Sequence, residues 1–511
     1  MARRKTTRVE FGDFQTPDAL AAAATEAVAS RGRQPLAIVE PTCGLGTFLF
    51  AALTRFDSCR EAFGLEINSE YFRRAHARLL KAKPRQDVDL RRADFFSFDW
   101  PSLFERLPEP ILVIGNPPWV TASELGALQS RNLPRKSNFQ GHRGLDAVTG
   151  KSNFDIAEWM VIHLMRWLSK RQATIAMLLK TTVARKVLLH AWRAGLPLAD
   201  AAMYFIDAKK HFGVGVEACL LVCDLRPGRA VAKCDVYNLG TSDLRERTVA
   251  FRDGLVLADA DAYDRHSNLL QDSDVEPRYR WRSGVKHDCA KVMELRRSDV
   301  GFLNGFDEVV DLEPDHVYPM LKGSGVANGG AAVGRRYMIV TQHETGQSTD
   351  LIKATAPKTW AYLCRHGDTL DRRASSIYRN RPRFSMFGVG PYTFMPWKVA
   401  ICGLYKRLEF CVIAPYQGKP VVLDDTVYQL SCETETEARL LVDLLTSEQA
   451  TDFLGAFIFW DAKRPITVEI LRRLDILALA QEMGKWGDLV AIRPAITRSQ
   501  QSHQLPAQRL F

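Results

Sequence analysis

Short apolar runs alternate with longer amphipathic stretches along the first half of the chain. Runs of strand length occur at 36–40, 62–67, 88–94, 111–116, 174–180, 202–207 and 218–225, and stretches with helical spacing occur at 17–31, 47–56, 69–82, 154–169 and 183–194. This alternation predicts a doubly wound α/β fold, with a mostly parallel sheet and helices on both faces. The last two runs are too close together for a helical crossover, so we expect the sheet to end in an antiparallel hairpin.

The strand–helix alternation ends near residue 226. Beyond that point we expect a second domain of mixed α+β type, with helices near 351–365, 435–447 and 467–482 and strands at 398–405 and 420–425. We place the domains at 1–245 and 246–495, followed by a flexible tail over 496–511. The polar segment 120–152 directly follows the fourth predicted strand, and a long polar loop in that position favours a functional role.

The composition is that of a soluble protein with an anionic partner. The 511 residues are 46% hydrophobic and 25% charged, with a net charge of +10. This charge favours nucleic acid as a partner, although a merely basic enzyme has the same balance. The chain has no apolar run of roughly 18 residues, as a membrane span needs, and its basic N-terminus has no apolar region typical of a secretory signal. We therefore expect a cytoplasmic protein without a membrane.

The ten cysteines are scattered and lie mostly inside apolar runs. That usage is typical of reduced core thiols in the cytoplasm and does not suggest a disulfide framework. Cys219, Cys223 and Cys234 are close in sequence, but they form no CxxC pair and have no nearby histidine. We therefore predict core packing for them and no metal site.

A glycine turn follows the first predicted strand in "VEPTCGLGTFL" (39–49). Gly44 and Gly46 permit a tight turn and close approach of a ligand to the backbone. The segment lacks both the GxGxxG spacing and the lysine of a P-loop, which disfavours phosphate. Glu40, followed by Pro41 at the strand end, suits a cationic amino group instead. An ordinary turn is the alternative for a glycine pair taken alone.

Acids also end the second and third predicted strands. Glu66, in "GLEIN", is placed to accept hydrogen bonds from ribose hydroxyls, and Asp94, in "ADFF", to accept one from an exocyclic amine. Each alone is more typical of a helix N-cap or a solvated turn. Together with Glu40 they place three acids at one sheet edge, where α/β sheets bind ligands. The pattern describes a nucleoside that carries an amino acid and no phosphate, as S-adenosyl-L-methionine does.

The fourth predicted strand brings "NPPW" (116–119) to the same edge. The Asn116 side-chain oxygen and the Pro117 carbonyl are two acceptors that Pro117 and Pro118 hold rigidly, and Trp119 offers a flat face. Two acceptors can bind the hydrogens of an exocyclic amine while the ring stacks on its base, which favours attack by the nitrogen on a sulfonium methyl. A base in duplex DNA must be flipped out to reach such a site. A rigid turn is the structural alternative.

These motifs resemble, in order, those of the gamma-class DNA amino-methyltransferases, which act on adenine N6 in restriction–modification systems. "FQTP" (14–17) resembles that family's N-terminal cofactor motif, "NFDIAEWMVIHLMRWL" (153–168) the helix after the catalytic motif, and "KKHFGVGVEACLLV" (209–222) its hairpin. Trp119 stands where tyrosine is commoner. The resemblance implies a Rossmann-like methyltransferase domain, double-stranded DNA as partner and a separately encoded restriction endonuclease.

The resemblance also assigns residues. It implies catalytic or base-contacting roles for Asn116, Pro117, Pro118, Trp119 and Phe212, and cofactor contacts from Thr16, Pro17, Glu40, Pro41, Gly44, Gly46, Glu66, Ile67, Asp94 and Asn116. Segments 282–295 and 318–326 resemble the opening of that family's target-recognition domain, and 384–407 resembles a segment of related modification enzymes. The resemblance therefore implies that the second domain binds DNA.

Basic residues mark where DNA is expected to lie. Arginines suit phosphates and guanine edges, and neighbouring aromatic rings suit stacking. The candidates in the second domain are Arg372, Arg373, Arg379, Arg381, Arg383 and Lys398, and those in the polar segment are Arg135, Lys136 and Arg143. A solvated charged face is the alternative.

The leading hypothesis is therefore an S-adenosylmethionine-dependent DNA adenine-N6 methyltransferase. Cytosine N4, RNA adenine and a protein glutamine amide are alternative targets for the same chemistry. A non-catalytic DNA-binding specificity subunit is the alternative of another class.

Overall fold

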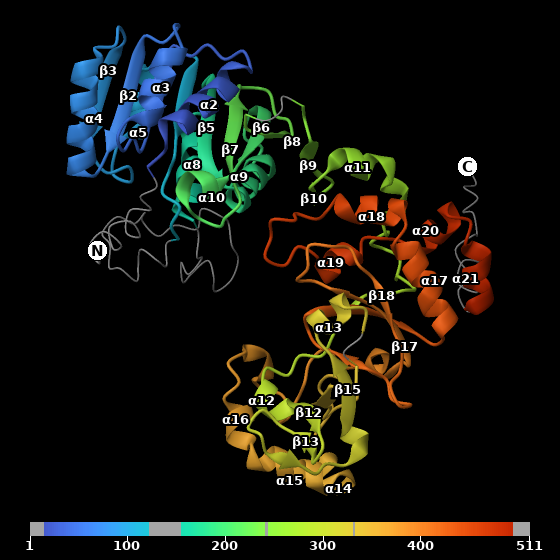
Figure 1. The fold of residues 1–511 in the computed structure, drawn as a ribbon. Helices are drawn as coiled ribbons and strands as arrows, with labels where there is room; N and C mark the ends of the chain where they lie inside the picture. Colours follow the sequence, from blue (N-terminus) through green and yellow to red (C-terminus); the bar gives the residue numbers. More distant parts are fainter. Residues whose placement is uncertain (1–14, 122–154, 241–243, 331–332, 494–511) are drawn as a thin grey trace, which may run out of the picture. The chain divides into compact units, whose positions relative to one another are not determined.

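The structure is a computed structural model that describes residues 15–121, 155–240, 244–330 and 333–493. The chain divides into two compact units between Asp261 and Ala262 (Figure 1). None of the helices in the described ranges is both long and apolar enough to span a bilayer.

Unit 1 is built on a ten-stranded sheet of order β10-β9-β8-β6-β7-β5-β4-β1-β2-β3. Its strands are β1 (Ala37–Glu40), β2 (Glu61–Glu66), β3 (Asp87–Arg92), β4 (Ile111–Gly115), β5 (Ala173–Lys180), β6 (Leu198–Ile206), β7 (Ala218–Leu225), β8 (Lys233–Asn238), β9 (Arg247–Arg252) and β10 (Leu255–Leu257). The pairs β3–β2, β2–β1, β1–β4 and β4–β5 are parallel. The prediction of a mostly parallel sheet over the first five strands is confirmed.

The predicted antiparallel hairpin is also present, with one added feature. β7 pairs with β6 over its whole length and also inserts between β6 and β5, antiparallel to both. The turn between β6 and β7 contains a short helix, α10 (Ala208–Phe212). Asp207 caps this helix, because its side chain accepts a hydrogen bond from the Lys210 N–H. Over the seven strands β6-β7-β5-β4-β1-β2-β3, β7 alone is reversed, and this order is that of the Rossmann-like methyltransferase sheet.

Helices cover both faces of the sheet (Figure 1). They are α2 (Asp18–Ala29), α3 (Thr47–Arg55), α4 (Ser69–Ala82), α5 (Trp100–Arg106), α8 (Ile156–Trp167) and α9 (Thr181–Arg193). The core of one face joins α2 and α3 to alternate residues of the central strands, such as Ile38, Leu112 and Leu178. Trp100 of α5 instead packs edge-on against Phe63, whose neighbours in β2 face the other way. The alternation of side chains along each strand therefore divides the core between two layers.

The predicted boundary after residue 245 falls inside this sheet. β9 and β10 follow that position, and β9 pairs antiparallel with β8. Cys219, Cys223 and Cys234 are fully buried in the same sheet, which confirms their predicted place in the core.

Unit 2 contains two smaller sheets, of order β14-β13-β12-β16-β15-β19 and β11-β20-β17-β18. The strands are β11 (Arg282–Ser283), β12 (Glu294–Ser298), β13 (Gly301–Leu303), β14 (Val309–Val310), β15 (Val317–Leu321), β16 (Arg336–Ile339), β17 (Trp397–Cys402), β18 (Cys411–Ile413), β19 (Val422–Leu423) and β20 (Val427–Cys432). The helices are α11 (Ala260–Arg265, which spans the boundary), α12 (Ala290–Met293), α13 (Gly323–Ala327), α14 (Ile352–Thr355), α15 (Pro357–Arg365), α16 (Gly367–Asp371), α17 (Glu435–Leu445), α18 (Glu448–Gly455), α19 (Val468–Leu471), α20 (Ile476–Glu482) and α21 (Trp486–Ile492).

Two predicted helices of unit 2 are each split in two. The helix predicted over 351–365 is interrupted before Pro357, because a residue that precedes proline is driven out of the helical region, as the φ of −143° at Ala356 shows. The helix predicted over 467–482 breaks before Asp475, whose carboxylate caps α20 by accepting the Leu477 and Ala478 N–H groups.

Candidate active site

The carboxyl ends of four adjacent strands form one edge of the sheet in unit 1. β4 lies beside β1, β1 beside β2 and β2 beside β3, and all four run in the same direction. Glu40 ends β1, Glu66 ends β2, and Asn116 directly follows β4. The strand order therefore brings the predicted glycine turn, acids and NPPW motif to a common edge.

Glu66 ties the glycine turn to the second strand. Its buried carboxylate accepts hydrogen bonds from the Gly44 N–H at 2.7 Å and from the Asn68 N–H at 2.7 Å. Gly44 and Gly46 both have positive φ, +51° and +75°, which favours glycine at each position. At Gly46 a Cβ would also lie 2.8 Å from the Phe50 ring. The turn has little space for larger residues.

Glu40, at the end of β1, contacts the first turn of α3 through its carboxylate. It is 3% exposed, and its carboxylate accepts a hydrogen bond from the Leu49 N–H at 2.8 Å. Burial raises the pKa of Glu40 well above its usual value, and the negative charge of Glu66 raises it further, although the hydrogen bond from Leu49 opposes both effects. Glu40 therefore has a structural partner in addition to its predicted one.

Asn116 is joined to the N-terminal motif. Its side-chain amide donates a hydrogen bond to Thr16 Oγ1 at 3.3 Å, across 100 positions of sequence. Thr16 and Asn116 are both half-buried, as is Pro118, whereas Pro117 is buried. Two motifs that were predicted separately, FQTP and NPPW, thus meet at one point.

Trp119 and Phe212 lie in direct contact. Their ring centroids are 5.3 Å apart and the ring planes meet at 70°, an edge-to-face contact, and each residue is 6% exposed. Trp119 also donates its indole N–H to the Leu178 carbonyl of β5 at 3.1 Å. The structure thereby brings together the two aromatic residues that the sequence predicts for one site.

The other predicted cofactor residues lie along the same edge. The Asp94 carboxylate accepts a hydrogen bond from the Phe96 N–H at 3.0 Å and so shapes its own turn. Ile67 is 38% exposed, which is unusual for a large apolar side chain at a strand end. Pro17 is exposed at the start of α2, and Pro41 is buried directly after β1.

An ion pair beside NPPW was not predicted. Lys180, at the end of β5, bonds to Asp155 Oδ2 at 2.8 Å, and Asp155 also caps α8 by accepting the Ala157 N–H. Asp155 forms an isolated bridge with Thr121, just after the motif. The capping pattern in "NFDIAEW" was visible in the sequence, but the partner on β5 depends on the tertiary fold.

Comparison with curated proteins decides the family. No family model matches the sequence. The chain is 46% identical over 476 residues to the Type II methyltransferase M.NspV of Nostoc sp. (strain ATCC 29411 / PCC 7524), across 93% of this chain and 98% of that protein. The chain belongs to the Type II methyltransferase family.

Two restriction–modification enzymes are among the solved structures that align with this chain. The Type IIL restriction-modification enzyme MmeI, solved in complex with DNA, aligns with a TM-score of 0.49 at 12% identity, over 98% of this chain and 71% of that chain. The type I restriction enzyme EcoKI M protein aligns with a TM-score of 0.32 at 15% identity, over 44% of this chain and 48% of that chain.

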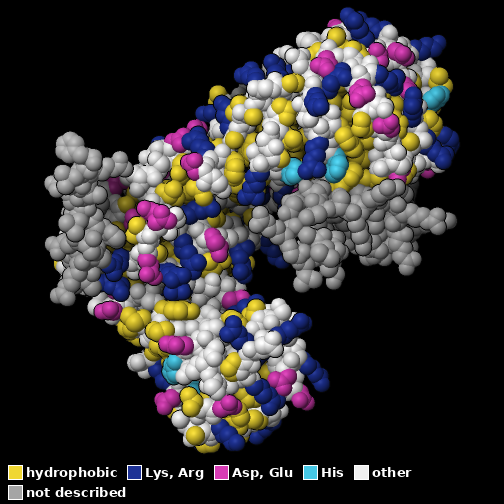
Figure 2. Space-filling view, turned by 180° about the vertical axis from the view of Figure 1, so that it is seen from behind, with side chains coloured by type: hydrophobic (Ala, Val, Ile, Leu, Met, Phe, Trp, Pro, Cys, Tyr) yellow, Lys and Arg dark blue, Asp and Glu magenta, His cyan; other side chains and the backbone are white. Residues whose placement is uncertain are grey.

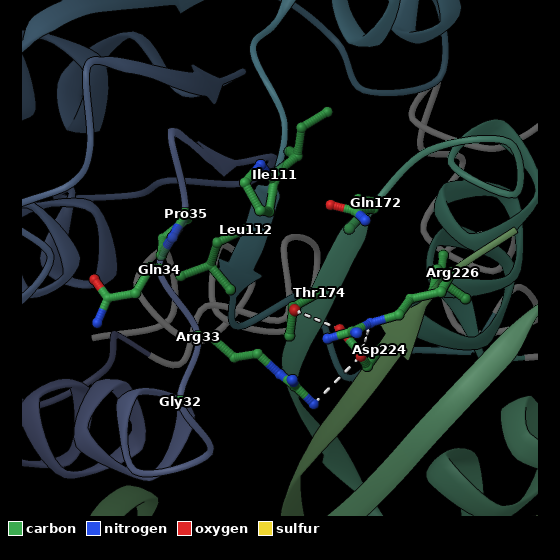
Figure 3. Close-up of a pocket in the computed structure, with 13 residues that line it drawn as sticks. Gly32, Arg33, Gln34, Pro35, Ile111, Leu112, Gln172, Thr174, Asp224 and Arg226 are labelled. Carbon is green, nitrogen blue, oxygen red and sulfur yellow. Dashed lines mark hydrogen bonds and ion pairs between the residues drawn. The ribbon is translucent and has the colours of Figure 1, made fainter. Parts of the chain in front are cut away.

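The opposite edge of the methyltransferase sheet holds a polar pocket (Figure 3). It is lined by the 32–35 loop, by the amino ends of β4 and β5, and by the carboxyl end of β7. Arg33 and Arg226 both point toward Asp224, at 3.3 Å and 2.9 Å, and Thr174 donates to Asp224 at 3.1 Å. No signal in the sequence pointed to this pocket.

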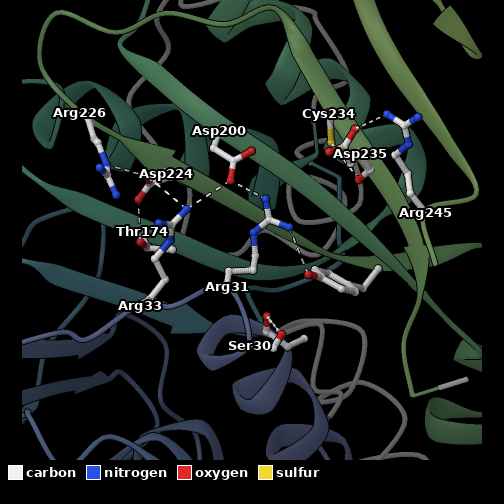
Figure 4. A network of polar contacts seen from close by, with 12 residues as sticks. Ser30, Arg31, Arg33, Thr174, Asp200, Asp224, Arg226, Cys234, Asp235 and Arg245 are labelled. Carbon is white, nitrogen blue, oxygen red and sulfur yellow. Dashed lines mark hydrogen bonds and ion pairs between the residues drawn. The ribbon is translucent and has the colours of Figure 1, made fainter. Parts of the chain in front are cut away.

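A network of ion pairs adjoins the pocket (Figure 4). Asp200 of β6 pairs with Arg31 and, at 3.2 Å, with Arg33, which also pairs with Asp224 of β7. Two carboxylates on neighbouring strands thus balance arginines of the loop before β1. The network fixes that loop to the sheet. The arginines around the pocket are largely neutralised by Asp200 and Asp224 of the same unit.

The arginines of unit 2 that were predicted to contact DNA differ in whether they already have partners within the protein. Arg373 is directed inward: it donates to the carbonyls of Leu370, His287 and Ser385 at 2.8, 3.3 and 2.7 Å. Arg383 pairs with Asp371 at 2.9 Å. Arg372, Arg379 and Arg381 are exposed, and the described part of the chain shows no ion pair for any of them.

The structure contradicts the predicted role of Lys398. It was predicted to contact DNA, but its side chain is fully buried, and Nζ donates to the Met395 carbonyl at 2.7 Å. The residue lies in β17, a central strand of the four-stranded sheet, so alternation along the strand directs it into the protein. A fully buried amine cannot reach a phosphate.

Net charge does not locate a DNA interface by itself. Figure 2 shows lysine and arginine side chains spread over the visible face, with acidic side chains among them. The predicted contacts Arg135, Lys136 and Arg143 fall outside the described residues, as does most of the polar segment 120–152.

Proposed function

We propose that this Type II methyltransferase is a site-specific DNA methyltransferase that transfers a methyl group from S-adenosyl-L-methionine to the exocyclic N6 of a flipped adenine. The observation that carries the proposal is the meeting of Asn116 with Thr16, at 3.3 Å, on the sheet edge where Glu40 and Glu66 end their strands. A nucleoside donor and a target amine need adjacent sites, and this edge supplies both sets of acceptors.

The residues at this edge fit the donor. Two backbone N–H groups hold the Glu66 carboxylate, which supports its proposed role as acceptor for the ribose hydroxyls. Exposed Ile67 is proposed to offer an apolar surface to the base. Within the glycine turn, Thr42 Oγ1 is buried without a hydrogen-bond partner in the described ranges, and a bound ligand would satisfy it. When bound, S-adenosylmethionine supplies an electrophilic sulfonium methyl group.

The target amine is assigned to the NPPW turn. The Asn116 side-chain oxygen and the Pro117 carbonyl accept the two amine hydrogens, which turns the nitrogen lone pair toward the methyl group. The same acceptors stabilise the positive charge that develops on the nitrogen. Trp119 stacks on the base, and since this residue is only 6% exposed, base entry displaces atoms that now cover it. Phe212 contacts the base beside it.

Expression of the chain in a bacterium without DNA methylation tests the proposal. Sequencing of its genome for modified bases is expected to show N6-methyladenine at one recurring short sequence. N4-methylcytosine in its place would retain the mechanism and change the target. Modified RNA with unmodified DNA would favour the RNA alternative, and sequence-specific binding with no modification would favour a specificity subunit.

We also propose that the enzyme is the modification component of a restriction–modification or related defence system. M.NspV, to which the chain is 46% identical, bears the name of a Type II methyltransferase. In such a system the modification protects self DNA from a separately encoded endonuclease. DNA purified from the expressing strain would then resist cleavage by a nuclease of the same specificity.

A further inference from the structure

A rigid platform lies on the surface of unit 2 around Tyr378. The Arg373 guanidinium lies 3.7 Å from the centre of the Tyr378 ring, and three backbone carbonyls hold it there. Tyr378 ends a short 3-10 helix, Ser376–Tyr378, and its ring contacts Phe387 edge-on at 5.6 Å. A half-buried cation, a phenol ring and a second aromatic ring therefore hold the chain up to residue 378.

The next three residues, Arg379, Asn380 and Arg381, project from this platform and are all exposed. The structure describes no acidic partner for either arginine. Asn380 has a φ of +60°, a left-handed conformation that asparagine tolerates better than most residues, so the turn has a defined shape. Arg381 is pre-positioned, since its guanidinium lies 5.6 Å from the centre of the Phe387 ring and beside Gly346.

The arginines of this turn differ from the nearby Arg373 and Arg383, whose guanidinium groups already have partners within the protein. Arg373 uses its donors on backbone carbonyls, and Arg383 is neutralised by Asp371. Arg379 and Arg381 keep their donors available for a ligand, and an asparagine amide lies between them. Arginine is suited to pair with the two acceptors of guanine in the major groove, and asparagine with the donor and acceptor of adenine.

We infer that the 379–381 turn reads base edges of the DNA target and so determines which sequence is methylated. This inference rests on the proposed function. The platform under the turn supplies rigidity, which discrimination between bases requires, since a mobile side chain adapts to the wrong base. Arg372, exposed and without this support, contacts phosphate instead.

The test compares single variants of the full-length protein in selection from a random pool of DNA duplexes. Asn380→Gly is the sharpest variant, because glycine keeps the positive φ and removes the amide. It is expected to bind duplexes with one position of the preferred sequence relaxed, and Arg381→Ala likewise at another position, with an affinity loss of about 10- to 100-fold for the original sequence.

Arg439→Ala is the matched control, since it removes one positive charge from an exposed arginine of α17 that is already paired with Glu435 and is not among the predicted DNA contacts. It is expected to keep the wild-type preference. Arg372→Ala is expected to weaken binding to all sequences equally and to reduce the salt dependence by about one counterion. The inference is overturned if Asn380→Gly and Arg381→Ala retain the wild-type preference, or if they weaken binding without relaxing any position.

The readout is binding, so it separates this inference from the proposed function. A wild-type protein that selects a DNA sequence and does not methylate it would refute the catalytic proposal, yet the variants would still test the turn. A wild-type protein that selects no sequence would overturn both.

Discussion

At the scale of single residues, Asn116 is expected to act in catalysis and not in cofactor binding. Its amide group bonds to Thr16, and its oxygen is assigned to the target amine. Asn116→Ala is expected to lower the methylation rate by at least about 100-fold, because an acceptor that acts on charge developing in the transition state is lost. Binding of S-adenosylmethionine, measured by calorimetry, is expected to change little. A matching loss of cofactor affinity would show that Asn116 serves binding instead.

Lys398 is expected to make the free energy of unfolding depend on pH. Burial lowers its pKa to about 7, whereas an unfolded lysine has a pKa of about 10.4. Between these values the unfolded chain binds more protons than the folded chain, so the free energy of unfolding rises with pH. From pH 7 to pH 9 this one residue is expected to add about 2 kcal/mol. Lys398→Met removes the titrating group, so urea unfolding of this variant should lack that gain; an equal gain in both proteins would contradict the assignment.

At the scale of single elements, Glu40 has two roles that a pair of variants can separate. Its carboxylate accepts the Leu49 N–H in the first turn of α3. Burial disfavours the charged form of Glu40, and the cofactor's cationic amino group is proposed to restore that form when it binds. Glu40→Gln keeps an acceptor and removes the charge, so unfolding is expected near the wild-type denaturant concentration while cofactor affinity falls about tenfold or more. Glu40→Ala leaves a backbone donor without its partner and is expected to cost a further 1–3 kcal/mol or so of stability. Unchanged cofactor affinity in the glutamine variant would leave Glu40 a purely structural role.

Elements of unit 1 could be predicted from sequence because each carries its own signal. The run "ILVIG" is buried on both sides and became β4, and Asn68 and Asp155 cap helices that the sequence already indicated. The positions of Glu66 and Asn116 followed from strand ends and were predictable too. Lys398 was misassigned because a basic residue amid arginines looks exposed until the strand that carries it is placed at the centre of a sheet. The partners of Trp119 and Lys180 on other strands depend on contacts distant in sequence.

At the scale of the whole molecule, unit 1 is expected to fold by itself. The chain divides into its two compact units between Asp261 and Ala262, and β9 and β10 complete the sheet of the first unit. A fragment of residues 1–261 is therefore expected to unfold cooperatively and to bind S-adenosylmethionine.

A fragment of residues 1–245 provides the comparison. It lacks β9, so the backbone groups of β8 that pair with β9 become an open sheet edge, and the apolar contacts of Val249 and Ala250 are lost. We expect this shorter fragment to aggregate or to melt at a lower temperature, as calorimetry and light scattering would show. Neither fragment is expected to select a DNA sequence, since the exposed arginines of unit 2 are absent from both. Sequence-selective binding by the 1–261 fragment would place target recognition in unit 1 and contradict the assignment of that role to unit 2.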